Sequence, residues 1–225
     1  VGSEMCIRDS SEEEITVTIG AVDEVVEIEL VNYFIKGNIE LNKVDKDYPD
    51  NKLTGAEFEV YTDTNGDGKL DNGDKLLGTM TELDGGVYQM KELRYGKYLV
   101  REKTAPTGFV LDENVYSVPI EENGKTYIVE NEAGVGFVNA AQKGSLKIVK
   151  TSSDGKVEGF SFRVTGADGY DQTFKTDKNG EIFIEGLRIG EYTVSEVNDS
   201  VSAGYILPAD KQATVKVGAT TIVEM

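Results

Sequence analysis

The chain repeats itself, and this repeat constrains its fold more than any other feature. Segment 139–150 copies segment 32–43, with an Asn, a Lys, a Gly and a final Lys at the same offsets. The second copy lies 107 residues after the first (139 − 32). A period near 100 residues indicates tandem domains, because the units of solenoid proteins are only about 20–50 residues long.

Further matches set the boundaries of the repeated modules. Four more pairs of segments agree: 93–102 with 187–196, 55–60 with 159–164, 108–111 with 204–207, and 16–21 with 214–219. They predict four parts. Residues 1–10 match nothing later and read as a non-native leader, which we exclude from the fold. Residues 11–36 are the C-terminal strands of a truncated upstream module, 37–143 form a complete module, and 144–225 form a module truncated before its last strand ends.

Short runs of alternating polar and apolar residues predict the fold of each module. In Ile39-Glu-Leu41-Asn and Phe58-Glu-Val60-Tyr, every second side chain is apolar, as expected for strands that bury one face. Asn-Gly and Asp-Gly pairs, such as those ending in Gly124 and Gly155, separate these runs and indicate turns. Short strands at this spacing predict an all-β chain of tandem antiparallel, immunoglobulin-like β-sandwiches with about seven strands each.

Composition excludes several classes of function. The formal net charge is −18, which disfavours nucleic-acid or anionic-membrane partners, and no apolar run is long enough to span a membrane. The absence of His excludes catalytic sites built on an imidazole and zinc sites of the Cys/His kind. Cys6 is the one cysteine and lies in the predicted leader, so no intrachain disulfide strengthens the modules.

Three stretches of the chain resemble one known family. Segment 37–45 (Gly-Asn-Ile-Glu-Leu-Asn-Lys-Val-Asp), segment 96–109 and segment 136–139 (Gly-Phe-Val-Asn) are similar to the Cna-B-type, SpaA-like, prealbumin-like modules of Gram-positive surface adhesins and pilins. The Glu-x-x-Ala-Pro-x-Gly-aromatic string at 102–109 is the most specific part. Residues 144–225 depart from the family here, because Glu196 is followed by no Ala-Pro pair.

The resemblance implies a self-formed isopeptide bond in each complete module. Its positions here are Lys43 as the amine, Asn139 as the acceptor and Glu102 as the proton relay, with Asn131 as a rival acceptor. Burial in an apolar core lowers the pKa of an amine and raises that of a carboxyl group. A neutral lysine can then attack an amide that the protonated acid polarises. The reaction occurs once per chain, so no enzyme activity is expected.

Strand alternation supports this assignment from the residues themselves. Lys43 shares the inward face of Ile39 and Leu41, and Glu102 shares that of Val100. The same parity recurs in the second module for Lys150 and Glu196, whose acceptor is missing, while Asn32 is an acceptor whose lysine also lies outside this chain. Charged side chains on an apolar face are costly unless they are paired. The alternatives are strand ends that point to water, or a buried ion pair without a crosslink.

An insertion in the first module carries the pattern of a calcium loop. Six positions of segment 63–74 have the spacing of the oxygen ligands in an EF-hand loop, although the last ligand is Asp where Glu is usual and no helices flank it. The alternative is an acidic hairpin loop without metal. The predicted ligands are Asp63, Asn65, Asp67, the carbonyl of Lys69, Asp71 and Asp74.

The sequence therefore predicts an extracellular structural protein. We expect a stalk segment of a cell-wall-anchored adhesin or pilin on a Gram-positive bacterium, with no cofactor beyond Ca²⁺ in the insertion. Its expected partners are neighbouring modules of the same chain. A module that binds host matrix protein or carbohydrate is the alternative, which the absence of Trp disfavours.

Overall fold

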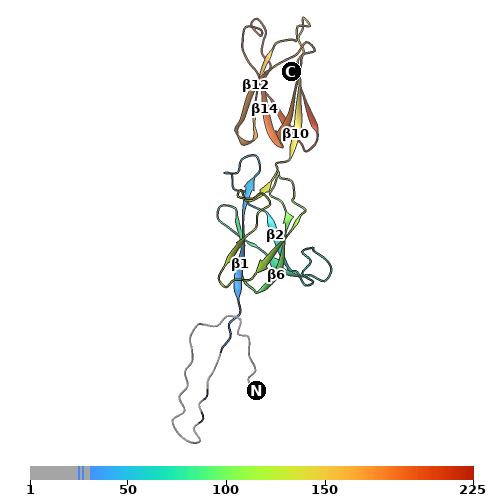
Figure 1. Ribbon diagram of the computed structural model, residues 1–225. Helices are drawn as coiled ribbons and strands as arrows, with labels where there is room; N and C mark the ends of the chain where they lie inside the picture. Colours follow the sequence, from blue (N-terminus) through green and yellow to red (C-terminus); the bar gives the residue numbers. More distant parts are fainter. Residues whose placement is uncertain (1–24, 26, 28–30) are drawn as a thin grey trace. The chain divides into compact units, whose positions relative to one another are not determined.

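The computed structural model describes residues 25, 27 and 31–225 (Figure 1). The predicted leader, 1–10, and the strand match at 16–21 lie outside these residues. The described chain forms two compact units. The first contains residues up to 42 together with 57–103 and 113–137, and the second contains 43–56, 104–112 and 138–225. The boundary between the units thus passes through the strands of the first β-sandwich.

The first sandwich consists of two sheets. One has the strand order β4-β5-β1-β8, with β9 also paired to β1, and the other has the order β3-β2-β6-β7. The strands are β1 (Lys36–Asp45), β2 (Glu57–Thr62), β3 (Lys75–Thr79), β4 (Thr81–Leu83), β5 (Val87–Arg94), β6 (Gly96–Thr104), β7 (Val115–Ile120), β8 (Thr126–Ile128) and β9 (Phe137–Asn139).

Aromatic side chains from both sheets fill the first core. Phe58 on β2 meets Tyr88 on β5 with ring centroids 5.1 Å apart, and it meets Phe137 at 5.0 Å. Both contacts are edge-to-face, the geometry that the ring quadrupoles favour. Strand β1 lies between β5, to which it is antiparallel, and β8, to which it is parallel. The first strand of the module is therefore central in its sheet.

The second sandwich repeats this plan with seven strands. Its sheets have the orders β13-β10-β16 and β12-β11-β14-β15, and strand β16 is parallel to β10 as β8 is to β1. The strands are β10 (Lys143–Val149), β11 (Ser161–Gly166), β12 (Tyr170–Lys175), β13 (Glu181–Arg188), β14 (Gly190–Glu196), β15 (Lys211–Val215) and β16 (Thr220–Glu224).

These two sandwiches confirm the predicted all-β, tandem antiparallel fold. Seven strands correspond one to one between the sandwiches, and the first adds β4 and β9. Among the described residues the one helical element is a 3₁₀ turn at Ala167–Gly169. No helix in this described part of the chain is long and apolar enough to cross a membrane.

Two glycines of the repeat have a steric role. A Cβ on Gly37 would lie 2.8 Å from the carbonyl oxygen of Lys125, and one on Gly144 would lie 2.1 Å from that of Lys216. Any larger residue would push the neighbouring backbone away from the start of β1 or β10. The glycine that marks each copy in the sequence is thus required by the close approach of the turn that precedes β8 or β16.

Candidate functional site

Alternation along β1 and β10 carries a lysine into each core. On β1, Ile39, Leu41 and Lys43 are all fully buried. In the second sandwich Lys150, directly after β10, is only 8% exposed and continues the buried series of Leu146 and Ile148. The predicted inward parity of both lysines is confirmed, which removes the alternative that they point to water. An ammonium group in such a place requires a partner or loss of its charge.

The partner of Lys43 in the second compact unit is the predicted acceptor. Lys43 Nζ donates a hydrogen bond of 2.6 Å to Asn139 Oδ1, and Asn139 is 2% exposed. Asn139 is held in place by its backbone, since its carbonyl accepts a 3.0 Å hydrogen bond from the amide of Lys46. The amine therefore lies beside the carboxamide that an isopeptide bond would consume.

Glu102 is buried in the first compact unit. It lies on β6 and is 3% exposed, which agrees with the inward parity predicted for it. The core of this unit is aromatic, because Phe137 contacts both Phe58 and Tyr116. Apolar surroundings of this kind favour the neutral forms of an amine and a carboxyl group. The approach of Glu102 to the Asn139 amide stays a prediction.

The two other asparagines differ from Asn139 in their surroundings. Asn131 is half-buried at the start of the turn that precedes β9, where its amide donates to the carbonyl of Gly136. Asn32 is exposed and lies outside any strand. Of these three asparagines, only Asn139 is both buried and on a strand paired to β1. That Lys43 reacts with Asn139 and not with Asn131 remains a prediction.

The second sandwich contains a buried ion pair at the corresponding place. Lys150 Nζ lies 2.8 Å from Glu196 Oε2 and 5.0 Å from the centre of the Phe160 ring. Both side chains are buried, and Glu196 Oε1 has no hydrogen-bond partner among the described residues. The repeat thus brings lysine and glutamate together as predicted, with one carboxylate oxygen left unsatisfied.

Strand register shows how the last residues of the second sandwich align with Asn139. The amide of Thr151, one residue after Lys150, donates to the carbonyl of Met225. In the first sandwich the amide of Lys46, three residues after Lys43, donates to the carbonyl of Asn139. When the two lysines are aligned, Met225 therefore corresponds to Phe137, two residues before Asn139. Within residues 144–225, no residue takes the place of Asn139.

The predicted calcium ligands form an ordered loop. Asp63 accepts hydrogen bonds from the amides of Gly66 and Gly68, and Asp74 accepts from those of Thr64 and Asp71. The side-chain amide of Asn65 donates to Asp71. In the part of the chain that the structure describes, no three His, Cys, Asp or Glu side chains gather as a metal site would require. Calcium binding by this loop stays a prediction.

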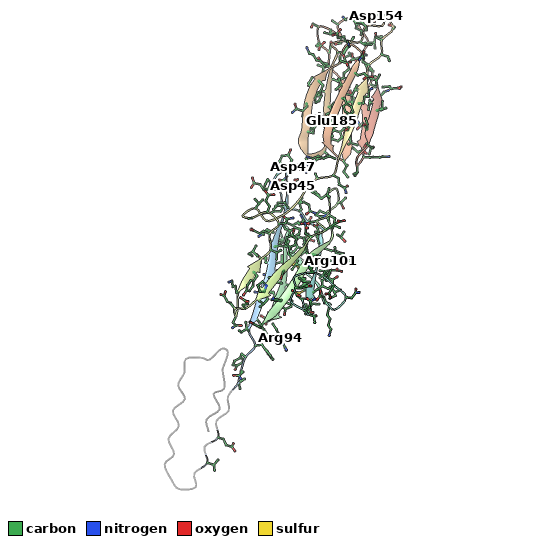
Figure 2. All side chains as sticks on the ribbon, turned by 45° about the vertical axis from the view of Figure 1, so that its right-hand side comes forward. Asp45, Asp47, Arg94, Arg101, Asp154 and Glu185 are labelled. Atoms are coloured by element: carbon green, nitrogen blue, oxygen red, sulfur yellow. The ribbon has the colours of Figure 1, made fainter. Side chains whose placement is uncertain are left out.

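Sequence reasoning missed one cluster of charged residues, centred on Arg188 and Asp45. Figure 2 shows Asp45 and Asp47 close together, and Arg188 contacts both. A signal was available, because Arg94 and Arg188 occupy the same position of the repeat. It was overlooked because neither residue belongs to the motif of lysine, glutamate and asparagine.

Comparison with known proteins places these features in a family. The family model described as SpaA, prealbumin-like fold domain, matches residues 37–133 and 144–225. Among solved structures, the Bacillus anthracis TIE protein is similar to this chain, with 27% sequence identity and a TM-score of 0.63. The match covers 84% of this chain and 33% of the TIE protein chain. This chain thus spans about a third of that protein. A search of curated proteins found no match.

Pilin structures are also among the matches. A Streptococcal ancillary pilin is 19% identical over 90% of this chain and 68% of its own, with a TM-score of 0.37. The shaft pilin SpaA of Lactobacillus rhamnosus GG is 16% identical over 84% of this chain and 97% of its own, with a TM-score of 0.36.

Proposed function

Since this chain belongs to the family of SpaA prealbumin-like fold domains, we propose that it is a non-enzymatic stalk segment of a Gram-positive cell-surface protein, an adhesin or a pilin. Its role is to carry load between neighbouring modules of the same protein. The proposal includes one internal crosslink, an isopeptide bond between Lys43 and Asn139. The observation that carries it is the fully buried contact of 2.6 Å between the Lys43 amine and the Asn139 amide oxygen.

The proposed reaction is balanced without any added reagent. The neutral Lys43 nitrogen attacks the side-chain carbonyl carbon of Asn139, and a new C–N bond forms. Glu102, protonated in the apolar core, polarises the carbonyl and delivers a proton to the departing NH₂ group, which leaves as ammonia. The proton that the lysine nitrogen loses returns to Glu102. Fixed positions in the folded core supply much of the rate.

The crosslink suits a stalk because of where it lies. It would join β1, the first strand of the sandwich, to β9, the last. A force applied at the two ends of the module would then load a covalent bond, where otherwise it would load the hydrogen bonds of the sheet. A chain whose single cysteine is Cys6 has no disulfide within the module to serve this purpose.

Intact-mass spectrometry of the full chain tests the crosslink. We expect a mass below that of the sequence by one ammonia, and a branched peptide joining Lys43 to Asn139 after proteolysis. Lys43→Met, Asn139→Ala and Glu102→Gln should each restore the sequence mass. Lys150→Met is the matched control and should leave the loss of ammonia in place. An unchanged mass in the parent chain would refute the crosslink.

A further inference from the structure

The largest ionic cluster of the second compact unit surrounds Arg188. This residue ends β13 and is directed at Asp45, which lies 143 positions earlier in the sequence. The two Arg188 nitrogens Nη1 and Nη2 donate to the two oxygens of Asp45 at 2.6 and 2.8 Å. This is the bidentate geometry in which a guanidinium binds a carboxylate most strongly.

Two further carboxylates and two aromatic rings complete the cluster. Arg188 also donates to Asp47 at 3.2 Å and to Asp168 at 3.1 Å. Its guanidinium lies 4.8 Å from the ring centre of Tyr48 and 5.8 Å from that of Phe109. Lys143 adds a second cation, at 2.9 Å from Asp47.

Burial makes the central pair stronger than a surface ion pair. The side chain of Asp45 is 1% exposed and that of Arg188 is 14% exposed. Exposed ion pairs contribute about 0–1 kcal/mol, whereas removing one partner of a buried pair leaves an uncompensated charge. Arg188 therefore supplies the counter-charge of the buried Asp45 carboxylate.

The backbone of Arg188 is fixed in place by its own sandwich. Tyr192, a buried residue two positions into β14, donates its hydroxyl to the Arg188 carbonyl at 3.0 Å. The next amide, that of Ile189, donates to the carbonyl of Gln142 at 3.1 Å. The guanidinium is thus presented from a rigid strand end and needs little ordering to bind its carboxylates.

The first copy of the repeat has the same backbone contacts without the carboxylates. Tyr98 donates its hydroxyl to the Arg94 carbonyl, and the amide of Tyr95 donates to the carbonyl of Ile35. Among the described residues, however, Arg94 has no ion pair, and its guanidinium lies 4.1 Å from the centre of the Phe34 ring. The repeat therefore provides one arginine that binds carboxylates, Arg188, and one that binds none among the described residues, Arg94.

We propose that Arg188 is a carboxylate clamp that holds segment 43–56, through Asp45 and Asp47, to the sandwich formed by β10–β16. The segment and that sandwich belong to the same compact unit. The partner that such an arginine recognises is a loop carrying aspartates at the second and fourth positions after the buried lysine, which here are Asp45 and Asp47 after Lys43. The second module has Ser152 in place of the first of these aspartates.

Hydrogen exchange of the full chain tests the clamp at one amide. In Arg188→Ala, the Asp47 amide, which donates to Asp45 Oδ1 at 2.9 Å, should exchange faster by about tenfold or more, because segment 43–56 opens locally once the clamp is lost. Asp45→Asn should have the same effect without altering the β10–β16 sandwich. Raising NaCl from about 0.05 to 0.5 M should reduce the protection only slightly in the parent chain, since salt screens a buried ion pair much less than an exposed one.

Arg94→Ala is the matched control, since it removes the arginine at the same position of the repeat. It should leave exchange at Asp47 unchanged. Amides inside β14, such as that of Val194, report whether a variant has lost its sandwich altogether. If the Asp47 amide exchanges at the parental rate in both Arg188→Ala and Asp45→Asn, while Val194 stays protected, the clamp is refuted. This hydrogen-exchange result does not depend on the proposed crosslink, which intact-mass spectrometry tests separately.

Discussion

The two sandwiches have the same lysine and glutamate, yet their cores are completed differently. In the first, Lys43 reaches an asparagine on β9, a strand that residues 144–225 do not contain. In the second, Lys150 is paired with Glu196, and one glutamate oxygen has no partner among the described residues. The comparison shows that the repeat buries a lysine and a glutamate in both cores.

Removing the lysine of the first core should have the largest effect. In Lys43→Met, which keeps the side-chain volume, the free energy of unfolding of this sandwich should fall by about 4 kcal/mol or more. The reason is that the proposed crosslink would close a loop from Lys43 to Asn139, so that its loss would restore entropy to the unfolded chain. Denaturant titration followed by hydrogen exchange measures the change.

Lys36→Met is the control for that substitution. Lys36 lies on the same strand, but its ion pair with Glu92 is exposed to solvent. Its loss should change the free energy of unfolding by about 0–1 kcal/mol. Equal effects of the two substitutions would contradict a special role for Lys43.

The ion pair of the second core should respond in a different way. Lys150→Met or Glu196→Gln alone should destabilise this sandwich by about 3 kcal/mol, because each leaves a buried group without its counter-charge. The double variant Lys150→Met/Glu196→Gln should regain most of that loss, because no isolated charge remains. In the first core the double variant Lys43→Met/Glu102→Gln should regain none, since either substitution alone would already prevent the proposed covalent bond. Additive losses in the second core would contradict this difference.

Calcium should affect only the first sandwich, because the loop at 63–74 has no counterpart in the second. At a free concentration tenfold above its dissociation constant, calcium should stabilise the first sandwich by about 1.4 kcal/mol. Thermal unfolding with and without a chelator measures this. Asp63→Asn should abolish the response and Asp84→Asn, outside the loop, should retain it. A parent chain that unfolds identically in both conditions has an acidic loop without metal.

The smallest expected effect concerns a pair of aspartates at the same position of the repeat. The pKa of Asp47 lies below its ordinary value, chiefly because Lys143 hydrogen-bonds to it. The pKa of Asp154 is lowered from 3.8 to about 2, chiefly by the Tyr205 hydroxyl, with further hydrogen bonds from the Lys156 amide and Ser152. A depressed folded-state pKa means that Asp154 stabilises its loop above pH 3.8 and loses this contribution as the pH falls through about 2.

Tyr205→Phe isolates that contribution. The pKa of Asp154 should rise toward 3.8, as read from carboxyl carbon shifts in an NMR titration, while that of Asp47 should not move. The exposed position of this loop in the second sandwich is visible in Figure 2. An unchanged pKa would mean that the two remaining donors suffice to hold the carboxylate.

Local pattern predicted much of the fold but little of the long-range pairing. The runs around Ile39 and Phe58 lie on strands as expected, and the predicted inward faces of Lys43 and Glu102 are buried. Strands β4 and β9 exceeded the predicted number because short edge segments have no alternation to reveal them. The Arg188 cluster was missed because its members lie far apart in the sequence and on no common strand.

The sequence by itself determined the tandem β-sandwiches, their repeated glycines and the burial of one lysine in each. These properties follow from alternation and from turn residues, which act over a few positions. Only the tertiary structure decided that Lys43 meets Asn139, 96 residues away, and that Arg188 meets Asp45, 143 residues away. Such contacts depend on strand order and register, which the packing of whole sheets sets and which no short segment encodes.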